Sequence, residues 1–238
     1  MITLFNRLLR SPAEVAKDCR ADKGVAPIAA NAIAAIVVGT LFFGGAVGSW
    51  QGGRQIAFAA IKLTLVGLGT LVVCVPAFHA ITAVFGRPWA LRPAISIMLI
   101  AGARFSLILL AATPVLWLAI NLGAPYHLVK LLAALAYALG GLAALGLLLR
   151  SLGKGRDQLA TVTVFVGVFL LVGGQAAWVL RPYIGDPRHG TTPFFTNERE
   201  GGVAYQLYVS ARQLVAPTGP APGSQTTAPS SVDEARSP

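Results

Sequence analysis

Five long runs of apolar residues dominate the chain, and short charged or turn-forming stretches separate them. They cover residues 25–50, 63–85, 94–122, 131–149 and 159–180. A helix needs about 20 apolar residues to cross a hydrocarbon layer of about 30 Å. Apolar residues run all round each segment and do not alternate with polar ones, as the strands of an outer-membrane barrel would require. The pattern predicts an all-α fold: a polytopic transmembrane helix bundle with five spans.

The third run contains Arg104 and allows a second interpretation. If residues 90–103 crossed the membrane alone, the chain would have six spans, and both termini would lie on the same side. Such a stretch is shorter than the usual minimum for a transmembrane helix. Five spans are therefore favoured.

Lysine and arginine in the segments between the runs indicate the orientation of the chain. The side that holds the N-terminus carries 11 of these residues, whereas the opposite side carries 3, namely Arg54, Lys62 and Lys130. Short cytoplasmic segments are enriched in positive charge. The imbalance predicts a cytoplasmic N-terminus, and five crossings then place the C-terminus on the periplasmic or extracellular side.

Composition narrows the class of protein further. Charged residues make up 12% of the 238 positions, about half the usual share in soluble domains, and the mean hydropathy is +0.68. These values exclude a soluble globule, a disordered chain and, despite the net charge of +10, a nucleic-acid-binding module. Two cysteines exclude a disulfide scaffold. Arginine outnumbers lysine 14 to 5 in an Ala- and Gly-rich chain, which is typical of GC-rich bacterial genomes. We therefore expect the bacterial inner membrane as the location.

The segments at the two ends are predicted to lie outside the hydrocarbon. Residues 1–24 form an amphipathic cytoplasmic leader, in which Ser11, Pro12 and Glu14 mark a helix start. Its basic charge fits either the binding of anionic headgroups or a simple collar that sets the topology. Residues 216–238 are rich in Pro, Ser and Thr and are predicted to be disordered.

Residues 181–215 combine interface residues with a second short amphipathic helix on the periplasmic side. Tyr183, Phe194 and Phe195, together with Trp178 just before this segment, are suited to the membrane interface. Arg181 is a further candidate for contact with lipid or a partner. Leu207 and Leu214 then fall on the apolar face of a helix over residues 201–215. We expect this segment to dock on the outer face of the bundle, on the leaflet, or on another membrane or periplasmic protein.

Two ionisable side chains inside the runs are candidates for chemistry. His79 follows Pro76, which frees a backbone carbonyl, and Arg104 has no acidic partner in any run. Intramembrane ionisable residues mark proton or ion pathways in transporters. The simpler interpretations are a hydrogen-bonded packing histidine and an arginine that extends to the cytoplasmic headgroups.

The sequence contains none of the motifs that would indicate an enzyme. Cys19, Cys74 and the three histidines are scattered, with none at metal-ligand spacing. Neither a phosphate-binding glycine loop nor a Gly-x-Ser-x-Gly nucleophile motif occurs. We expect no catalysis, no cofactor, no metal and no nucleic-acid partner.

Small residues at four-residue spacing occur in three of the runs, where they allow helix backbones to approach closely. They are Gly44 and Gly48, then Ala136, Gly140 and Ala144, and finally Gly173 and Ala177. Packing within the bundle is the simpler interpretation, and contact with another membrane subunit is the alternative. Gln175 in the last run can hydrogen-bond across such an interface.

A leader containing Leu8-Leu9-Arg10-Ser11-Pro12 precedes a long first run and four further runs. This layout, over residues 1–180, resembles that of bacterial Yip1-domain membrane proteins. The resemblance implies a five-span protein without catalytic residues that acts in membrane organisation or trafficking. Eukaryotic relatives contact small GTPases through an Asp-Leu-Tyr-Gly-Pro-like motif, which has no match here, so GTPase binding is not implied.

Together these features favour a non-enzymatic integral membrane protein. We expect a scaffold or accessory subunit that presents its periplasmic segment for docking. The competing class is a small-molecule or ion transporter or channel that uses His79, Arg104 and helices kinked at Pro76 and Pro114. A channel requires polar residues aligned along one face of several helices, whereas Thr, Ser and Asn are scattered here.

Overall fold

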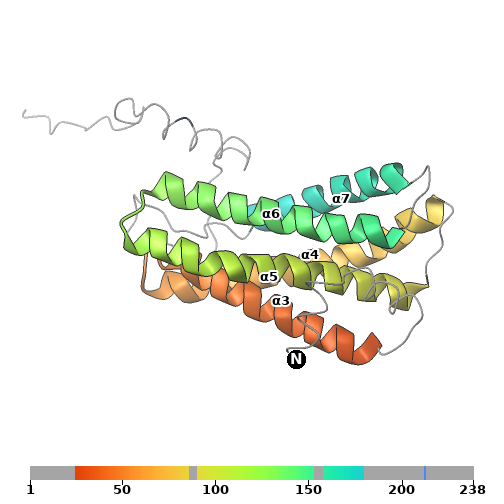
Figure 1. Ribbon diagram of the computed structural model, residues 1–238, viewed down its shortest axis with the longest axis horizontal. Coiled ribbons are helices and arrows are strands. Elements are labelled where there is room, and N and C mark those ends of the chain that lie inside the picture. Colours follow the sequence, from red (N-terminus) through yellow and green to blue (C-terminus); the bar gives the residue numbers. More distant parts are fainter. Residues whose placement is uncertain (1–24, 86–89, 153–157, 180–211, 213–238) are drawn as a thin grey trace, which may run out of the picture.

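The computed structural model describes residues 25–85, 90–152 and 158–179, together with Arg212. Within these ranges every regular element is an α-helix, which confirms the all-α prediction for this part of the chain. The helices are α3 (Val25–Gly48), α4 (Arg54–Val84), α5 (Leu91–Asn121), α6 (Tyr126–Leu152) and α7 (Gln158–Val179). Figure 1 shows them arranged as an elongated bundle.

Four of the described helices are long and apolar enough to cross a membrane. The candidate spans are Ile28–Gly48 in α3 and the whole of α4, α5 and α6. The fifth predicted span corresponds to α7, whose apolar stretch Leu159–Gln175 is shorter.

The third predicted span is one uninterrupted helix. A separate crossing over residues 90–103 would require a turn before Arg104, but α5 continues from Leu91 to Asn121 without one. The six-span interpretation that depends on that crossing is therefore wrong.

Glycines with positive φ separate the first two helices. Gly52 and Gly53 have φ angles of 77° and 56°, a backbone region that only glycine adopts without strain. Helix α4 therefore begins directly afterwards at Arg54. Lys62, which the charge pattern places in a loop, thus belongs to the third turn of α4.

Helix α3 is one of three helices at the centre of the packing, together with α4 and α5. It lies against both α4 and α5, while α6 packs chiefly on α5 and α7 chiefly on α4. Two apolar clusters fill the spaces between helices. One surrounds Ile36, Phe78 and Ile97, and the other surrounds Phe43 and Leu109. Figure 1 shows α7 at the edge of the bundle.

Candidate functional site

Two of the predicted small-residue contacts lie between α3 and α4. A Cβ atom added at Gly44 would lie 2.7 Å from the Cα of Ala60, and one added at Gly48 would lie 2.8 Å from the Cα of Ile56. These distances leave no room for a side chain, so the two backbones touch at both glycines. The prediction of packing within the bundle is confirmed for Gly44 and Gly48.

The contact between α3 and α5 uses a third glycine that four-residue spacing did not single out. A Cβ atom at Gly39 would overlap the backbone of Ser106. The Ser106 hydroxyl also donates a hydrogen bond of 3.1 Å to the backbone oxygen of Ala35. This pair of contacts fixes how far α3 and α5 are displaced along each other.

Two other glycines of the predicted set, Gly140 and Gly173, do not contact a neighbouring backbone as closely as Gly44 and Gly48 do. Gly140 of α6 faces the ring of Phe105, since an added Cβ would lie 2.8 Å from its Cδ2 atom. At Gly173 of α7 the nearest atom is a methyl of Thr70 at 3.7 Å, an ordinary van der Waals contact. Only the first of these two positions requires glycine for space.

Hydroxyl groups supply a further link within the bundle. The hydroxyls of Thr40 in α3 and Thr64 in α4 lie 3.0 Å apart, at hydrogen-bond distance. Each also lies within reach of a backbone oxygen of its own helix, that of Ile36 at 2.7 Å and that of Ala60 at 3.0 Å. Satisfied hydroxyl pairs of this kind join helices without exposing polar atoms to lipid.

His79 and Arg104 lie on different helices, α4 and α5. His79 is half-buried, and its Nδ1 atom is buried without a hydrogen-bond partner in the described ranges. Arg104 is also half-buried. Across the described residues, which contain no Asp or Glu, neither side chain forms an ion pair, and no hydrogen bond joins the two. The structure therefore does not bring these two candidates into one site.

Lys62 is a buried cation that the sequence analysis did not single out. Its side chain is fully buried, and it lies on the same face of α4 as the buried residues Gln55 and Ala59. The sequence signal for this position is the Gly52-Gly53 pair, because a helix that starts there carries Lys62 into the bundle.

Helix α7 presents one face that the other described residues leave uncovered. Its exposed residues recur every three or four positions and so form a single stripe. They are Leu159, Ala160, Thr163, Val164, Gly167, Leu170, Leu171, Gly174 and Gln175. A Cβ atom added at Gly167 or Gly174 would meet nothing within 4 Å. We call these residues the α7 stripe.

Aromatic residues gather where α3, α5 and α6 meet the loops between them. The Trp50 indole nitrogen donates to the backbone oxygen of Ala124 at 3.4 Å, which links the α3–α4 loop to the α5–α6 loop. The Trp50 and Tyr126 rings lie 5.1 Å apart, and the Lys130 ammonium lies 5.0 Å from the centre of the Tyr126 ring. Such aromatic and basic groups are typical of a membrane interface.

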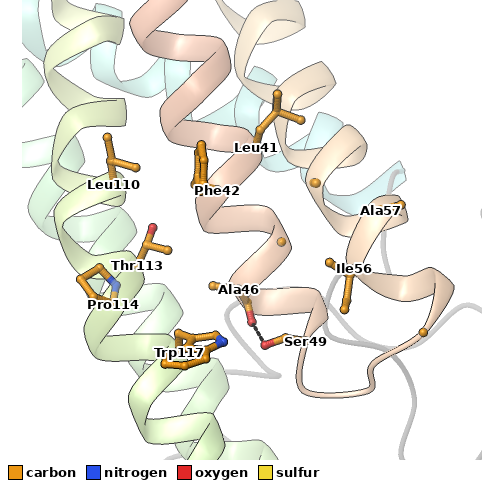
Figure 2. Close-up of a pocket in the computed structure, with 13 residues that line it drawn as sticks. Leu41, Phe42, Ala46, Ser49, Ile56, Ala57, Leu110, Thr113, Pro114 and Trp117 are labelled. Atoms are coloured by element: carbon orange, nitrogen blue, oxygen red, sulfur yellow. Dashed lines mark hydrogen bonds between the residues drawn. The ribbon is translucent and has the colours of Figure 1, made fainter.

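An apolar groove runs over α3 between α4 and α5 near this aromatic end (Figure 2). Its volume is about 950 Å³, and it opens to the outside of the bundle. From α3 and its C-terminal edge, the lining residues are Leu41, Phe42, Gly45, Ala46 and Ser49. Gly53, just before α4, and Ile56, Ala57 and Ala60 of α4 form a second wall. The third wall consists of Leu110, Thr113, Pro114 and Trp117 of α5. We call it the lateral groove. Nothing in the apolar pattern of the sequence predicted it, because it arises from how three helices diverge.

The remaining predicted contact residues are not part of the described structure. Trp178 belongs to α7, but its side chain is not described. The others lie outside the described residues: Arg181, Tyr183, Phe194, Phe195, Leu207 and Leu214. The amphipathic leader over residues 1–24 and the tail beyond residue 215 lie outside them as well.

Within the described ranges, no cluster of three or more His, Cys, Asp or Glu side chains is placed to hold a metal ion. Comparisons with protein-family models, curated proteins and solved structures gave no match. The site must therefore be interpreted from its own geometry. The α7 stripe and the lateral groove are two of its exposed apolar surfaces, and α6 exposes Leu135, Leu139 and Leu142 as well.

Proposed function

We propose that this chain is a non-enzymatic, multi-pass protein of the bacterial inner membrane that acts as a scaffold or accessory subunit. The N-terminus is cytoplasmic and the C-terminus periplasmic in this proposal, and the Yip1-like layout of the sequence accords with it. The observation that carries the proposal is the α7 stripe, a helix face that the rest of the described bundle leaves uncovered.

The composition of the α7 stripe supports contact with another transmembrane helix. Gly167 and Gly174 are seven residues apart on one face, and open space lies over both. Small residues at such positions let a second helix approach closely. Gln175 is exposed on the same face, and its amide would gain a hydrogen-bond partner across that contact. Lipid chains offer no such partner.

The periplasmic segment beyond α7 extends this proposal. The aromatic residues around Tyr183 and Phe194 follow α7 directly in sequence. A partner held against α7 would therefore lie close to the start of that segment. In this arrangement the helix face and the periplasmic segment together select the partner.

The test uses the full chain, extracted from native membranes in mild detergent and analysed for stoichiometric membrane partners. Gly167→Leu and Gly174→Leu fill open space, so the fold is retained while the approach of a second helix is blocked. We expect either glycine variant to lose most of the bound partner. Gln175→Leu should weaken partner binding.

The matched control is Gly69→Leu, which also adds a side chain to an exposed glycine in open space but lies on α4. Partner binding should be unchanged in this variant. If wild-type protein is monodisperse and free of partners, or if both α7 variants keep the partner at full occupancy, the scaffold proposal fails.

A transporter is the second candidate, supported by buried polar atoms on α4. Thr70 Oγ1 and His79 Nδ1 are both buried without hydrogen-bond partners in the described part of the chain. However, residues nine positions apart on an α-helix point in opposite directions. These two atoms therefore do not line one common path. Wild-type protein without partners, combined with substrate flux in vesicles, would favour this candidate.

A further inference from the structure

The lateral groove has the chemistry of a site for hydrocarbon. Its walls are made almost entirely of apolar side chains, among them Phe42, Ile56 and Leu110. The two hydroxyl groups that line it are already satisfied. Ser49 donates to the backbone oxygen of Ala46 at 2.7 Å, and Thr113 donates to that of Leu109 at 2.9 Å. An occupant therefore needs no polar groups along the body of the groove.

One end of the groove offers a place for an anion. Gly53 lines this end and is the N-cap of α4. Because glycine has no side chain, no side-chain hydrogen bond caps the first turn of this helix. The Gln55 N–H of the first turn already donates to the backbone oxygen of Gly52 at 3.2 Å. The remaining first-turn N–H groups and the helix dipole at such a terminus favour negative charge. Arg54 follows directly and is exposed. The described ranges contain no carboxylate that would compete for this charge.

Aromatic groups place the same end near a membrane surface. Trp117 lines the groove and is 54% exposed, and Figure 2 shows it close to Ser49 at the C-terminal edge of α3. Leu41 and Leu110 lie farther along, towards the middle of the bundle. Tryptophan side chains concentrate at the level of lipid headgroups. The groove thus runs from headgroup level into the hydrocarbon.

We propose that the lateral groove binds one anionic phospholipid. One of its acyl chains lies along Phe42, Ala46 and Thr113, and its phosphate lies at the first turn of α4 beside Arg54. The volume of about 950 Å³ is within the range of ligand sites. This inference concerns a different face from the α7 stripe and does not depend on the partner proposed there.

A lipid fits the groove better than a second transmembrane helix does. A helix would satisfy the apolar walls but would bring no charge to the anion site at Gly53 and Arg54. The combination of a hydrocarbon groove and a cationic end matches a molecule that joins apolar chains to a phosphate. That charge complementarity decides for a phospholipid.

The experiment uses the full chain in vesicles of phosphatidylcholine and phosphatidylglycerol. A trace of phosphatidylglycerol carries a photoactivatable group in its acyl chain, and the crosslinked residues are mapped by mass spectrometry. We expect crosslinks to concentrate on the lining residues of α3 and α5. The same probe with a phosphatidylcholine headgroup should crosslink there about fivefold less, the value of one cationic contact near the membrane surface.

Two variants separate the site from general contact with lipid. Gly45 lies on the groove wall, where an added Cβ meets only a methyl of Ile56 at 3.8 Å, so Gly45→Leu fills the groove without disturbing the backbone. It should remove most crosslinks of both probes. Arg54→Gln should remove the preference for phosphatidylglycerol and leave the phosphatidylcholine signal unchanged. Gly69→Leu, on an open face of α4, should change neither.

Even labelling of all outward faces in wild-type protein would overturn the proposal. So would unchanged crosslinking in Gly45→Leu, or an unchanged headgroup preference in Arg54→Gln. Wild-type protein that binds its partner but shows no lipid labelling in the groove would refute this inference alone. Wild-type protein that is labelled in the groove but binds no partner would refute only the function proposed for α7.

Discussion

Gly44 shows how one missing Cβ sets the distance between two helices. An alanine there would place its Cβ 2.7 Å from the Cα of Ala60 and 2.8 Å from the backbone oxygen of Ala59. Both neighbouring atoms are backbone, so they cannot move aside without shifting α4. We expect Gly44→Ala to destabilise the protein by about 1–3 kcal/mol, the usual cost of overpacking. Thermal unfolding of the purified protein in detergent measures the change.

The control for this prediction is Gly69→Ala on the outer side of α4. No atom lies within 4 Å of the added Cβ there. Because alanine favours helix more than glycine does, stability should be equal or slightly higher. Equal unfolding temperatures for the two variants would contradict close backbone contact at Gly44.

Single residues also mark the limit of what the sequence predicted. Four-residue spacing identified Gly44 and Gly48, because the contact of α3 with α4 repeats along one helix face. The same spacing did not identify Gly39, because Gly39 contacts a different helix, α5, and its partner Ser106 is 67 positions away in the sequence. Nothing local in a chain with 26 glycines tells which of them meets a distant backbone.

At the scale of the element, α5 explains the environment of Arg104. Ser106 lies beside both Ala35 and Gly39, so Arg104 lies close to the level of Ala35. The apolar window of α3 begins at Ile28, seven residues earlier. At about 1.5 Å per residue, Arg104 is on the order of 10 Å from the start of that window. A long basic side chain extends over much of that distance.

This position predicts how Arg104 responds to substitution. Lysine also reaches headgroups, so we expect Arg104→Lys to fold with an unfolding temperature close to that of the wild type. Arg104→Ser, which is too short to reach them, serves as the comparison and should be less stable. A large loss with lysine would instead indicate two-pronged recognition of a phosphate or carboxylate, which only arginine provides.

The helices themselves followed from the apolar runs, because a chain in lipid must satisfy its backbone within helices. Their ends followed less well. The sequence analysis started the second span after Lys62, taking the charge as a boundary, whereas α4 starts at Arg54. A buried lysine is tolerated once it lies inside a bundle and away from lipid, so charge alone does not mark where a helix begins.

The lateral groove and the α7 stripe cannot be attributed to a single residue or a single helix. The groove arises where α3, α4 and α5 diverge, and the stripe arises because α7 packs chiefly on α4. Apolar residues line the groove and also fill the core, so the two environments have the same sequence pattern. Only the arrangement of helices separates a surface that binds from one that is buried.

At the scale of the whole molecule, the hydrogen bond from Trp50 to Ala124 places two loops at one end of the bundle. The charge imbalance of the sequence predicts that this end is periplasmic. With Cys19 and Cys74 replaced by serine, single cysteines at Gln51 and Leu122 should react with a membrane-impermeant thiol reagent in intact spheroplasts. A cysteine at the exposed Arg150 should react only after the membrane is opened. Labelling of Gln51 and Leu122 from opposite sides would contradict the bundle, whereas labelling of Arg150 alone in intact spheroplasts would invert the predicted orientation.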